Sequence, residues 1–260
     1  MKNFPSIEGV QLAVSRLSKV IRKTPWEFNK RLSSLKNASV FFKREDLQQI
    51  RSFKIRGAYN KISSLSEEKR GVGIICASAG NHAQGFAFSC NKMQIEGVVY
   101  MPATTPQQKV SQVKMFGGKY IRVVLIGDTY DACQKYALKI AKKEGKTFIH
   151  AFDDTEVIEG QATIALEILE QSSKPLDYIF VPVGGGGLIS GIITVMSILS
   201  PETKIIGVEP QGAPSMHQSI ISDKRVVLKK IDNFVDGAAV REIGKIPFKI
   251  CKTQLDEIIT

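Results

Sequence analysis

Short apolar runs alternate with helical stretches along most of this chain, and the alternation constrains the fold more than any other feature. The runs are rich in β-branched and aromatic residues and lack the polar alternation of a strand with one face in water. Buried strands separated by helices are typical of parallel sheets with helices on both faces. The sequence therefore predicts an α/β fold with two doubly wound, mainly parallel sheets.

The predicted elements fill the chain with short connections. Strands are expected at residues 39–43, 73–77, 96–101, 120–125, 148–151, 178–183, 205–208 and 226–228. Helices are expected at residues 7–21, 53–65, 109–116, 129–144 and 156–170, with others after the strands at 73–77 and 178–183. Because this number of strand–helix units exceeds one small sheet, we expect two domains. The smaller would contain residues 73–149, and the larger, discontinuous domain would contain residues 1–66 and 150–260.

The stretch from Tyr178 to Leu199 has no charged residue and is long enough to cross a bilayer. It also contains Pro182, four glycines at 184–187 and Gly191. An interior glycine costs a helix about 1 kcal/mol relative to alanine, and a proline costs about 3 kcal/mol. We therefore expect a buried strand, a glycine turn and a helix here, and no association with a membrane.

The chain has 36 Lys and Arg against 25 Asp and Glu, a formal net charge of +11. These basic residues are scattered and no five are consecutive, which indicates a solvated surface and no nucleic-acid partner. The four cysteines are far apart and form no C-x-x-C pair, as is typical of a protein in a reducing cytoplasm. The first residues carry too many polar side chains for a secretory signal.

Four consecutive glycines, at 184–187, follow the strand expected at 178–183. Glycines let backbone N–H groups converge on an anion, and the start of the following helix adds about half a positive charge. A tight turn alone needs one or two glycines, so four favour a phosphate. The stretch matches neither the P-loop nor the G-x-G-x-x-G pattern, which argues against a nucleoside triphosphate or NAD.

Two other segments carry candidate chemistry. Ser78, Asn81 and His82 follow the strand at 73–77, and their donors suit a carboxylate or a phenolic oxygen as well as an ordinary helix cap. Lys54 lies between Phe53 and an isoleucine, close in sequence to other cations. Apolar surroundings and nearby positive charge lower the pKa of a lysine and make its amine nucleophilic, although most lysines are solvated.

A nucleophilic lysine, a phosphate-binding turn and an asparagine-bearing loop are the parts that a pyridoxal 5′-phosphate (PLP) site requires. The stretches S-F-K-I-R-G-A, S-A-G-N-H-A-Q-G and G-G-G-G, at 52–58, 78–85 and 184–187, resemble those of the threonine dehydratases, which are fold-type II PLP enzymes. The resemblance extends from about residue 7 to the C-terminus, with further similar stretches K-R-E-D-L-Q at 43–48, E-G-Q-A-T at 159–163, V-E-P-Q-G-A-P-S-M at 208–216 and F-V-D-G-A-A-V at 234–240.

The resemblance implies roles for single residues. Lys54 would hold PLP as a Schiff base and later remove the Cα proton, Phe53 would pack beside the ring, and Asn81 would bind the ring hydroxyl. The phosphate would be held by Gly184, Gly185, Gly186, Gly187 and the N–H of Leu188. The substrate carboxylate would be bound by Ser78, Gly80, Asn81 and His82.

The implied reaction is α,β-elimination of water from L-threonine, or from L-serine, giving 2-oxobutanoate or pyruvate and ammonia. In the biosynthetic members this is the first step toward isoleucine. Racemases of the family carry a second serine as a base where this sequence has Ala79. Relatives that bind a divalent cation have a carboxylate where Ser215 stands, beside counterparts of Glu209 and Ala213, so we expect no metal.

Family chains continue beyond the counterpart of Thr260, so the resemblance implies a C-terminally incomplete larger domain and no regulatory domain. Three alternatives stay open from the sequence: a non-catalytic remnant that binds a partner, an anion- or RNA-binding protein, and a serine racemase or other β-eliminase on the same scaffold. We expect a homo-oligomer with a small amino-acid substrate.

Overall fold

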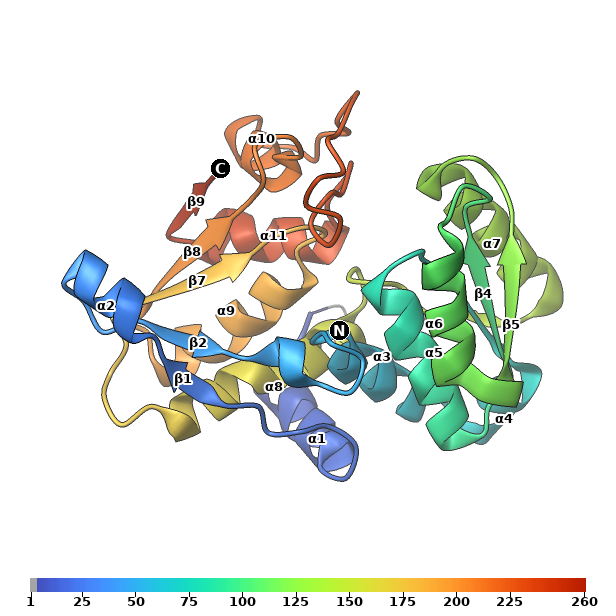
Figure 1. Cartoon of the computed structure of the whole chain (residues 1–260), viewed down its shortest axis with the longest axis horizontal. Helices are drawn as coiled ribbons and strands as arrows, with labels where there is room; N and C mark the ends of the chain where they lie inside the picture. Colours follow the sequence, from blue (N-terminus) through green and yellow to red (C-terminus); the bar gives the residue numbers. More distant parts are fainter. Residues whose placement is uncertain (1–3) are drawn as a thin grey trace.

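In the computed structural model, which describes residues 4–260, three β-sheets are surrounded by helices (Figure 1). The sheets with four and three strands are wholly parallel, and the third is a two-stranded antiparallel ribbon. The prediction of an α/β fold with mainly parallel sheets is therefore confirmed. Within the described range, no helix is both long enough and apolar enough to cross a bilayer.

The four-stranded sheet has the order β5-β4-β3-β6, and its strands are β3 (Ile74–Ala77), β4 (Gly97–Met101), β5 (Ile121–Leu125) and β6 (Thr147–Phe148). Strands β3 and β4 are buried along their whole length, as their unbroken apolar runs predict. Helices α5 (Asn81–Met93) and α6 (Gln107–Gly117) pack on one face, and α7 (Tyr130–Glu144) packs on the other. This sheet is therefore doubly wound.

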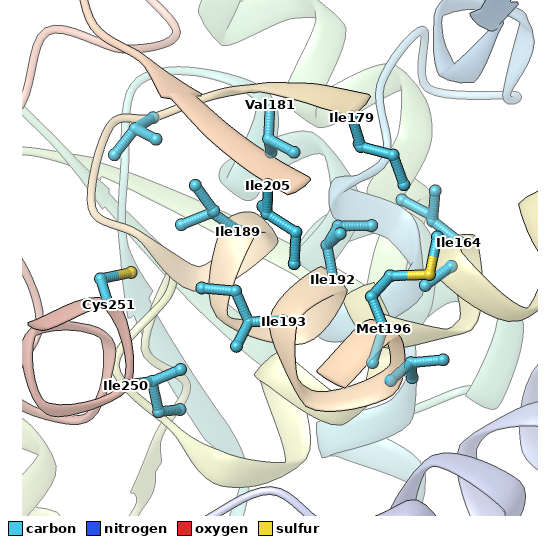
Figure 2. Close-up of a cluster of buried hydrophobic side chains, with 14 of the residues drawn as sticks. Ile164, Ile179, Val181, Ile189, Ile192, Ile193, Met196, Ile205, Ile250 and Cys251 are labelled. Carbon is cyan, nitrogen blue, oxygen red and sulfur yellow. The ribbon is translucent and has the colours of Figure 1, made fainter. Parts of the chain in front are cut away.

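The three-stranded sheet consists of β7 (Tyr178–Pro182), β8 (Lys204–Val208) and β9 (Glu257–Ile259). Along β7, Ile179 and Val181 point into the core, whereas Tyr178 and Phe180 are 53% and 62% exposed. The buried face packs on α9 (Gly187–Leu199), whose isoleucines fill the core shown in Figure 2. The uncharged stretch long enough to cross a bilayer thus forms the expected strand, turn and helix, but the strand is buried on one face only, contrary to the prediction of a buried strand.

One predicted strand is wrong. Residues 226–228 contain no strand, because the N–H of Val226 donates to the Ser219 side chain and the N–H of Leu228 donates to the Arg241 carbonyl, and neither bond belongs to a strand ladder. The remaining elements of the described chain are α1 (Ile7–Leu17), β1 (Trp26–Phe28), α2 (Lys30–Lys36), β2 (Phe41–Lys43), η1 (Glu45–Leu47), α3 (Lys54–Ser63), α4 (Glu67–Val72), η2 (Gly118–Tyr120), α8 (Thr155–Gln171), α10 (Ser215–Ile221) and α11 (Lys245–Gln254).

Helix α3 lies between the two parallel sheets, packed against α5 on one side and α8 on the other (Figure 1). Two glycines allow these close approaches. A Cβ on Gly85 of α5 would lie 3.0 Å from the Lys54 carbonyl oxygen, and a Cβ on Gly160 of α8 would lie 2.6 Å from the Arg56 carbonyl oxygen. The first turn of α3 is therefore held where the two regions of the molecule meet.

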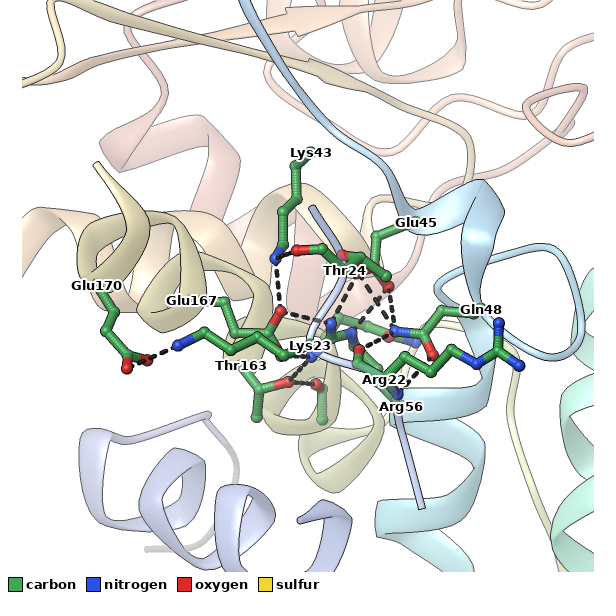
Figure 3. A network of polar contacts seen from close by, with 12 residues as sticks. Arg22, Lys23, Thr24, Lys43, Glu45, Gln48, Arg56, Thr163, Glu167 and Glu170 are labelled. Carbon is green, nitrogen blue, oxygen red and sulfur yellow. Dashed lines mark hydrogen bonds and ion pairs between the residues drawn. The ribbon is translucent and has the colours of Figure 1, made fainter. Parts of the chain in front are cut away.

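A buried ion-pair network fixes the outer side of α3 (Figure 3). Arg56 is fully buried and contacts carboxylate oxygens of Glu45 and Glu167, each at 2.7 Å, while Lys43 contacts Glu167 at 2.6 Å. Burial alone would lower the pKa of Arg56, but the hydrogen bonds and charges of the two glutamates outweigh burial and raise it. The network thus joins β2, η1, α3 and α8 through paired charges.

Candidate functional site

Lys54 is the first residue of α3, and its amine lies in a different environment from that of Arg56. Its Nζ donates a hydrogen bond to the Ala151 carbonyl at 2.9 Å and lies 5.4 Å from the centroid of the Phe53 ring. Within residues 4–260 no carboxylate forms an ion pair with it. Burial lowers the pKa of Lys54 to about 8, so a neutral, nucleophilic amine is accessible near physiological pH.

His82, on the first turn of α5, is a buried neutral imidazole close to Lys54. Burial, followed by the charge of Lys54, lowers the pKa of His82 to about 3. Its Nε2 lies 3.1 Å from the Ile149 carbonyl oxygen, so the proton sits on Nε2 and donates there. Its Nδ1 is buried without a partner in the described chain. The side chain is thus committed to Ile149, and its backbone N–H is what remains for a substrate carboxylate.

The turn between β3 and α5 presents unpaired donors. Ser78 is buried, and its Oγ accepts the N–H of Gly80 at 3.2 Å. Helix α5 begins after Gly80 without a side-chain cap, and the N–H groups of residues 81–83 donate to no group of the described chain. Asn81 is exposed and lies next to Gly237. Its side-chain amide nitrogen is 4.0 Å from the position that a Cβ on Gly237 would occupy. This turn can therefore bind a carboxylate through backbone N–H groups.

Close packing and backbone conformation require glycine at several of the four positions, whether or not an anion binds there. A Cβ on Gly185 would lie 2.2 Å from the ring of Phe152, and one on Gly187 would lie 2.9 Å from the Phe152 Cβ. Gly186 has a φ of 89°, in the left-handed region that favours glycine. The count of glycines alone therefore does not argue for a phosphate, contrary to the reasoning from sequence.

The backbone of the turn provides a better argument for an anion. Helix α9 begins at Gly187 without a side-chain cap, and no N–H of residues 184–188, Leu188 included, donates a hydrogen bond within the described chain. The N–H groups of residues 184–188 thus lie free at the start of a 13-residue helix, where backbone donors and the helix dipole favour an anion such as phosphate.

Two segments outside the three motifs bring these motifs together. In the first, Ile149 accepts from His82, Ala151 accepts from Lys54, and Phe152 packs against the glycine turn. In the second, residues 237–238 lie between Gly184 and Asn81: a Cβ on Gly184 would be 3.1 Å from the Ala238 Cα. Sequence reasoning missed the first segment because backbone carbonyls and a packed ring carry no sequence signal of their own.

The family model described as "Pyridoxal-phosphate dependent enzyme" matches residues 17–260 of this chain. The chain belongs to this family of PLP-dependent enzymes. It is 49% identical over 253 residues to the biosynthetic L-threonine dehydratase IlvA of Halalkalibacterium halodurans, covering 97% of this chain and 61% of that protein. It is 48% identical over 263 residues to the same enzyme of Staphylococcus aureus, covering 100% of this chain and 62% of that protein. The chain thus spans about three fifths of these relatives.

Solved structures of PLP enzymes share the fold. The processed form of threonine deaminase isoform 2 from Solanum lycopersicum superimposes with a TM-score of 0.90 at 42% identity, covering 100% of this chain and 72% of that one. Maize serine racemase superimposes with a TM-score of 0.92 at 29% identity, covering 98% of this chain and 76% of the racemase chain. The fold-type II assignment made from the sequence is therefore confirmed.

The donor groups on this chain fit the cofactor of the family. PLP has an aldehyde that reacts with an amine and a phosphate that needs several donors. Lys54 offers a buried amine without a counterion, and the turn at 184–188 offers free N–H groups at a helix start. When bound, PLP supplies an electron sink for a carbanion at the substrate Cα. The motif with Lys54 and the glycine turn therefore offer groups that fit this cofactor.

Glu209, which the sequence resemblance aligns with a possible cation ligand, has backbone N–H groups as partners in this structure. Its two carboxylate oxygens accept the N–H groups of Met216 and His217, each at 2.8 Å, at the start of α10. Burial raises the pKa of Glu209 to about 7, against the lowering effect of these hydrogen bonds. In this structure Glu209 therefore caps a helix.

Proposed function

We propose that this chain catalyses the PLP-dependent removal of water from L-threonine, with L-serine as a second substrate. The products are 2-oxobutanoate or pyruvate, and ammonia. The observation that carries the proposal is the Lys54 amine, buried without a carboxylate beside two uncapped helix starts. The similarity to biosynthetic L-threonine dehydratases supports the choice of substrate, and with it a place at the start of isoleucine formation.

In this proposal each motif performs one task. Lys54 holds the cofactor through its amine and, once released by the substrate, removes the Cα proton. The N–H groups of 184–188 bind the cofactor phosphate, Phe53 flanks the ring, and Asn81 binds the ring hydroxyl. The substrate carboxylate is bound by Ser78 and by the first backbone N–H groups of α5, including that of His82.

Elimination is supported over racemisation by Ala79. A racemase needs a second base on the opposite side of the Cα atom, and the methyl group of Ala79 can neither give nor take a proton. The Lys54 amine alone serves a reaction that needs one base at this carbon.

We also propose the wider organisation of the protein. Residues 73–149, which contain the four-stranded sheet, form a smaller domain, and residues 1–66 with 150–260 form the larger one. The chain acts in the cytoplasm as a homo-oligomer. The four buried cysteines, which form no disulfide in the described chain, support a reducing compartment.

The test is production of keto acid by the purified chain with PLP and L-threonine. We expect 2-oxobutanoate from the native chain, none from Lys54→Ala, and native rates from Lys69→Ala, which changes an exposed lysine on α4. A folded native chain that binds PLP and forms no keto acid contradicts the proposal and favours a non-catalytic remnant. Formation of D-serine from L-serine instead favours a racemase.

A further inference from the structure

His150 lies outside the three motifs. It directly precedes Ala151 and Phe152, which contact Lys54 and the glycine turn. Its Nδ1 accepts the N–H of Asp153 at 2.9 Å and the N–H of Phe152 at 3.3 Å. A ring nitrogen that accepts two hydrogen bonds carries no proton, so the proton of His150 is on Nε2. That Nε2 lies 3.5 Å from the side-chain amide nitrogen of Gln134 on α7, and a protonated Nε2 donates to this amide only when the amide is turned so that its oxygen faces the ring. The ring therefore closes a tight turn over the three residues that follow it.

Each of these three residues makes a contact that shapes the site. The Ala151 carbonyl accepts from the Lys54 amine, and the Phe152 ring packs against the glycine turn. An oxygen of Asp153 accepts the N–H of Ile246 at 2.9 Å and so caps the start of α11. One imidazole thus orders three neighbouring groups that point in different directions.

We propose that His150 is a positioning residue for the PLP site, because its Nδ1 holds residues 151–153 in the turn that directs the Ala151 carbonyl at Lys54. This inference rests on the proposed function. His150 touches neither the cofactor phosphate turn nor the Lys54 amine through its own hydrogen bonds. It acts through the backbone that it organises.

The structure also predicts which side chains can take the place of His150. Asparagine places its Oδ1 as far from the backbone as histidine places its Nδ1, and asparagine closes such turns on its own N–H groups. Glutamine carries the same amide one methylene further out, and leucine has no acceptor. His150→Asn should therefore preserve the turn, whereas His150→Gln and His150→Leu should open it and admit water to Lys54.

The first readout needs no cofactor. Trace acetylation of the chain between pH 6 and 11, followed by mass spectrometry of the peptide with Lys54, gives the pKa of its amine. We expect a pKa near 8 in the native chain and in His150→Asn. It should rise toward the ordinary value in His150→Leu and His150→Gln. His217→Leu changes the third histidine of the chain, on α10, and should leave the pKa of Lys54 at the native value.

The second readout is the dissociation constant for PLP, from its absorbance. We expect about tenfold weaker binding in His150→Leu and His150→Gln, and native binding in His150→Asn. The inference is overturned if His150→Leu keeps the native pKa of Lys54 and the native affinity for PLP. It is also overturned if His150→Asn weakens PLP binding as much as His150→Gln does. The second comparison decides the matter even if His150→Leu does not fold. A native chain that binds no PLP contradicts the proposed function instead, and the acetylation profiles still test the positioning role.

Discussion

Lys54 and Arg56 are two residues apart on α3, both are cations, and the fold treats them in opposite ways. Arg56 is fully buried among the carboxylates of Glu45 and Glu167, which raise its pKa. Among residues 4–260, the Lys54 amine has one carbonyl as its hydrogen-bond partner, and burial lowers its pKa to about 8. Arg56 therefore serves as a structural cation of α3, whereas Lys54 of the same helix is the reactive amine of the proposed function.

The difference shows what separates a structural charge from a functional one. A buried charge with good partners is satisfied, and its removal harms the partners that remain. A buried charge without a counterion destabilises the fold, and its removal relieves that cost. Substitutions at the two positions should therefore have opposite effects on stability, and only those at Lys54 should abolish the reaction.

The largest effect is expected from Lys54→Ala on turnover. Removal of the amine deletes both the attachment point and the base, so kcat/KM for L-threonine should fall by at least about 10³-fold. Keto-acid production measured with PLP in excess checks this, and circular dichroism verifies that the variant is folded. A residual rate within tenfold of the native rate would contradict the assignment of Lys54.

The next largest effect is expected from Arg56→Leu on stability. Glu45 loses its cationic partner and Glu167 keeps Lys43 alone, so the free energy of unfolding at pH 7 should fall by about 3–5 kcal/mol. Part of this loss should be recovered at pH 5, because unpaired buried carboxylates take up protons more readily. Urea unfolding measures both values. Arg44→Leu, which removes an exposed arginine with acidic partners, is the matched control and should shift the urea midpoint far less.

Lys54→Met should act in the opposite direction from Arg56→Leu. The folded pKa of Lys54 lies below its ordinary value, so between about pH 8 and 10.5 the unfolded chain binds more protons and native stability rises with pH. Below pH 8 the native chain carries the whole cost of the buried charge. The cofactor-free variant should therefore be more stable at pH 7 by about 1–3 kcal/mol.

That gain should disappear toward pH 11, where the amine of Lys54 is neutral in both states. Urea unfolding of the native chain and the variant at several pH values between 7 and 11 gives the difference profile. Lys69→Met provides the control for an exposed lysine. A variant that is less stable than the native chain at pH 7 would show that Lys54 is a structural cation after all.

Sequence reasoning singles out Lys54 of this pair and assigns no role to Arg56. Lys54 was singled out by its apolar neighbours and by the resemblance, and the helix that carries it was expected at residues 53–65. The burial of Arg56 was not foreseen, because its partners lie 11 and 111 residues away in the chain. Pairing over such separations depends on tertiary structure and leaves no local pattern.

The same limit explains the errors in the fold. The buried strands β3 and β4 are predicted because their apolar runs are unbroken. Strand β9 was missed because it has three residues and exists through its pairing with β8, about 50 residues earlier. Residues 226–228 have a β-branched run but no neighbouring strand, so their propensity was not realised.

The smallest effect is expected from an ion pair at the edge of the Arg56 network. Lys23 and Glu170 approach to 2.7 Å, the same distance as Arg56 and Glu167, but their side chains are 48% and 68% exposed (Figure 3). Water screens such a pair, so Glu170→Gln should change the free energy of unfolding by less than about 0.5 kcal/mol. That change should shrink further in high salt.

Glu167→Gln is the matched substitution, because it removes the same charge from the same helix three residues earlier and leaves Arg56 with one carboxylate fewer. Urea unfolding of both variants in low and high salt compares the two pairs at equal distance. A loss in Glu170→Gln as large as that in Glu167→Gln would mean that distance, and not burial, sets the strength of these pairs. The contrast between Lys54 and Arg56 would then need another explanation, because it assumes that a buried charge needs an ion-pair partner more than an exposed charge does.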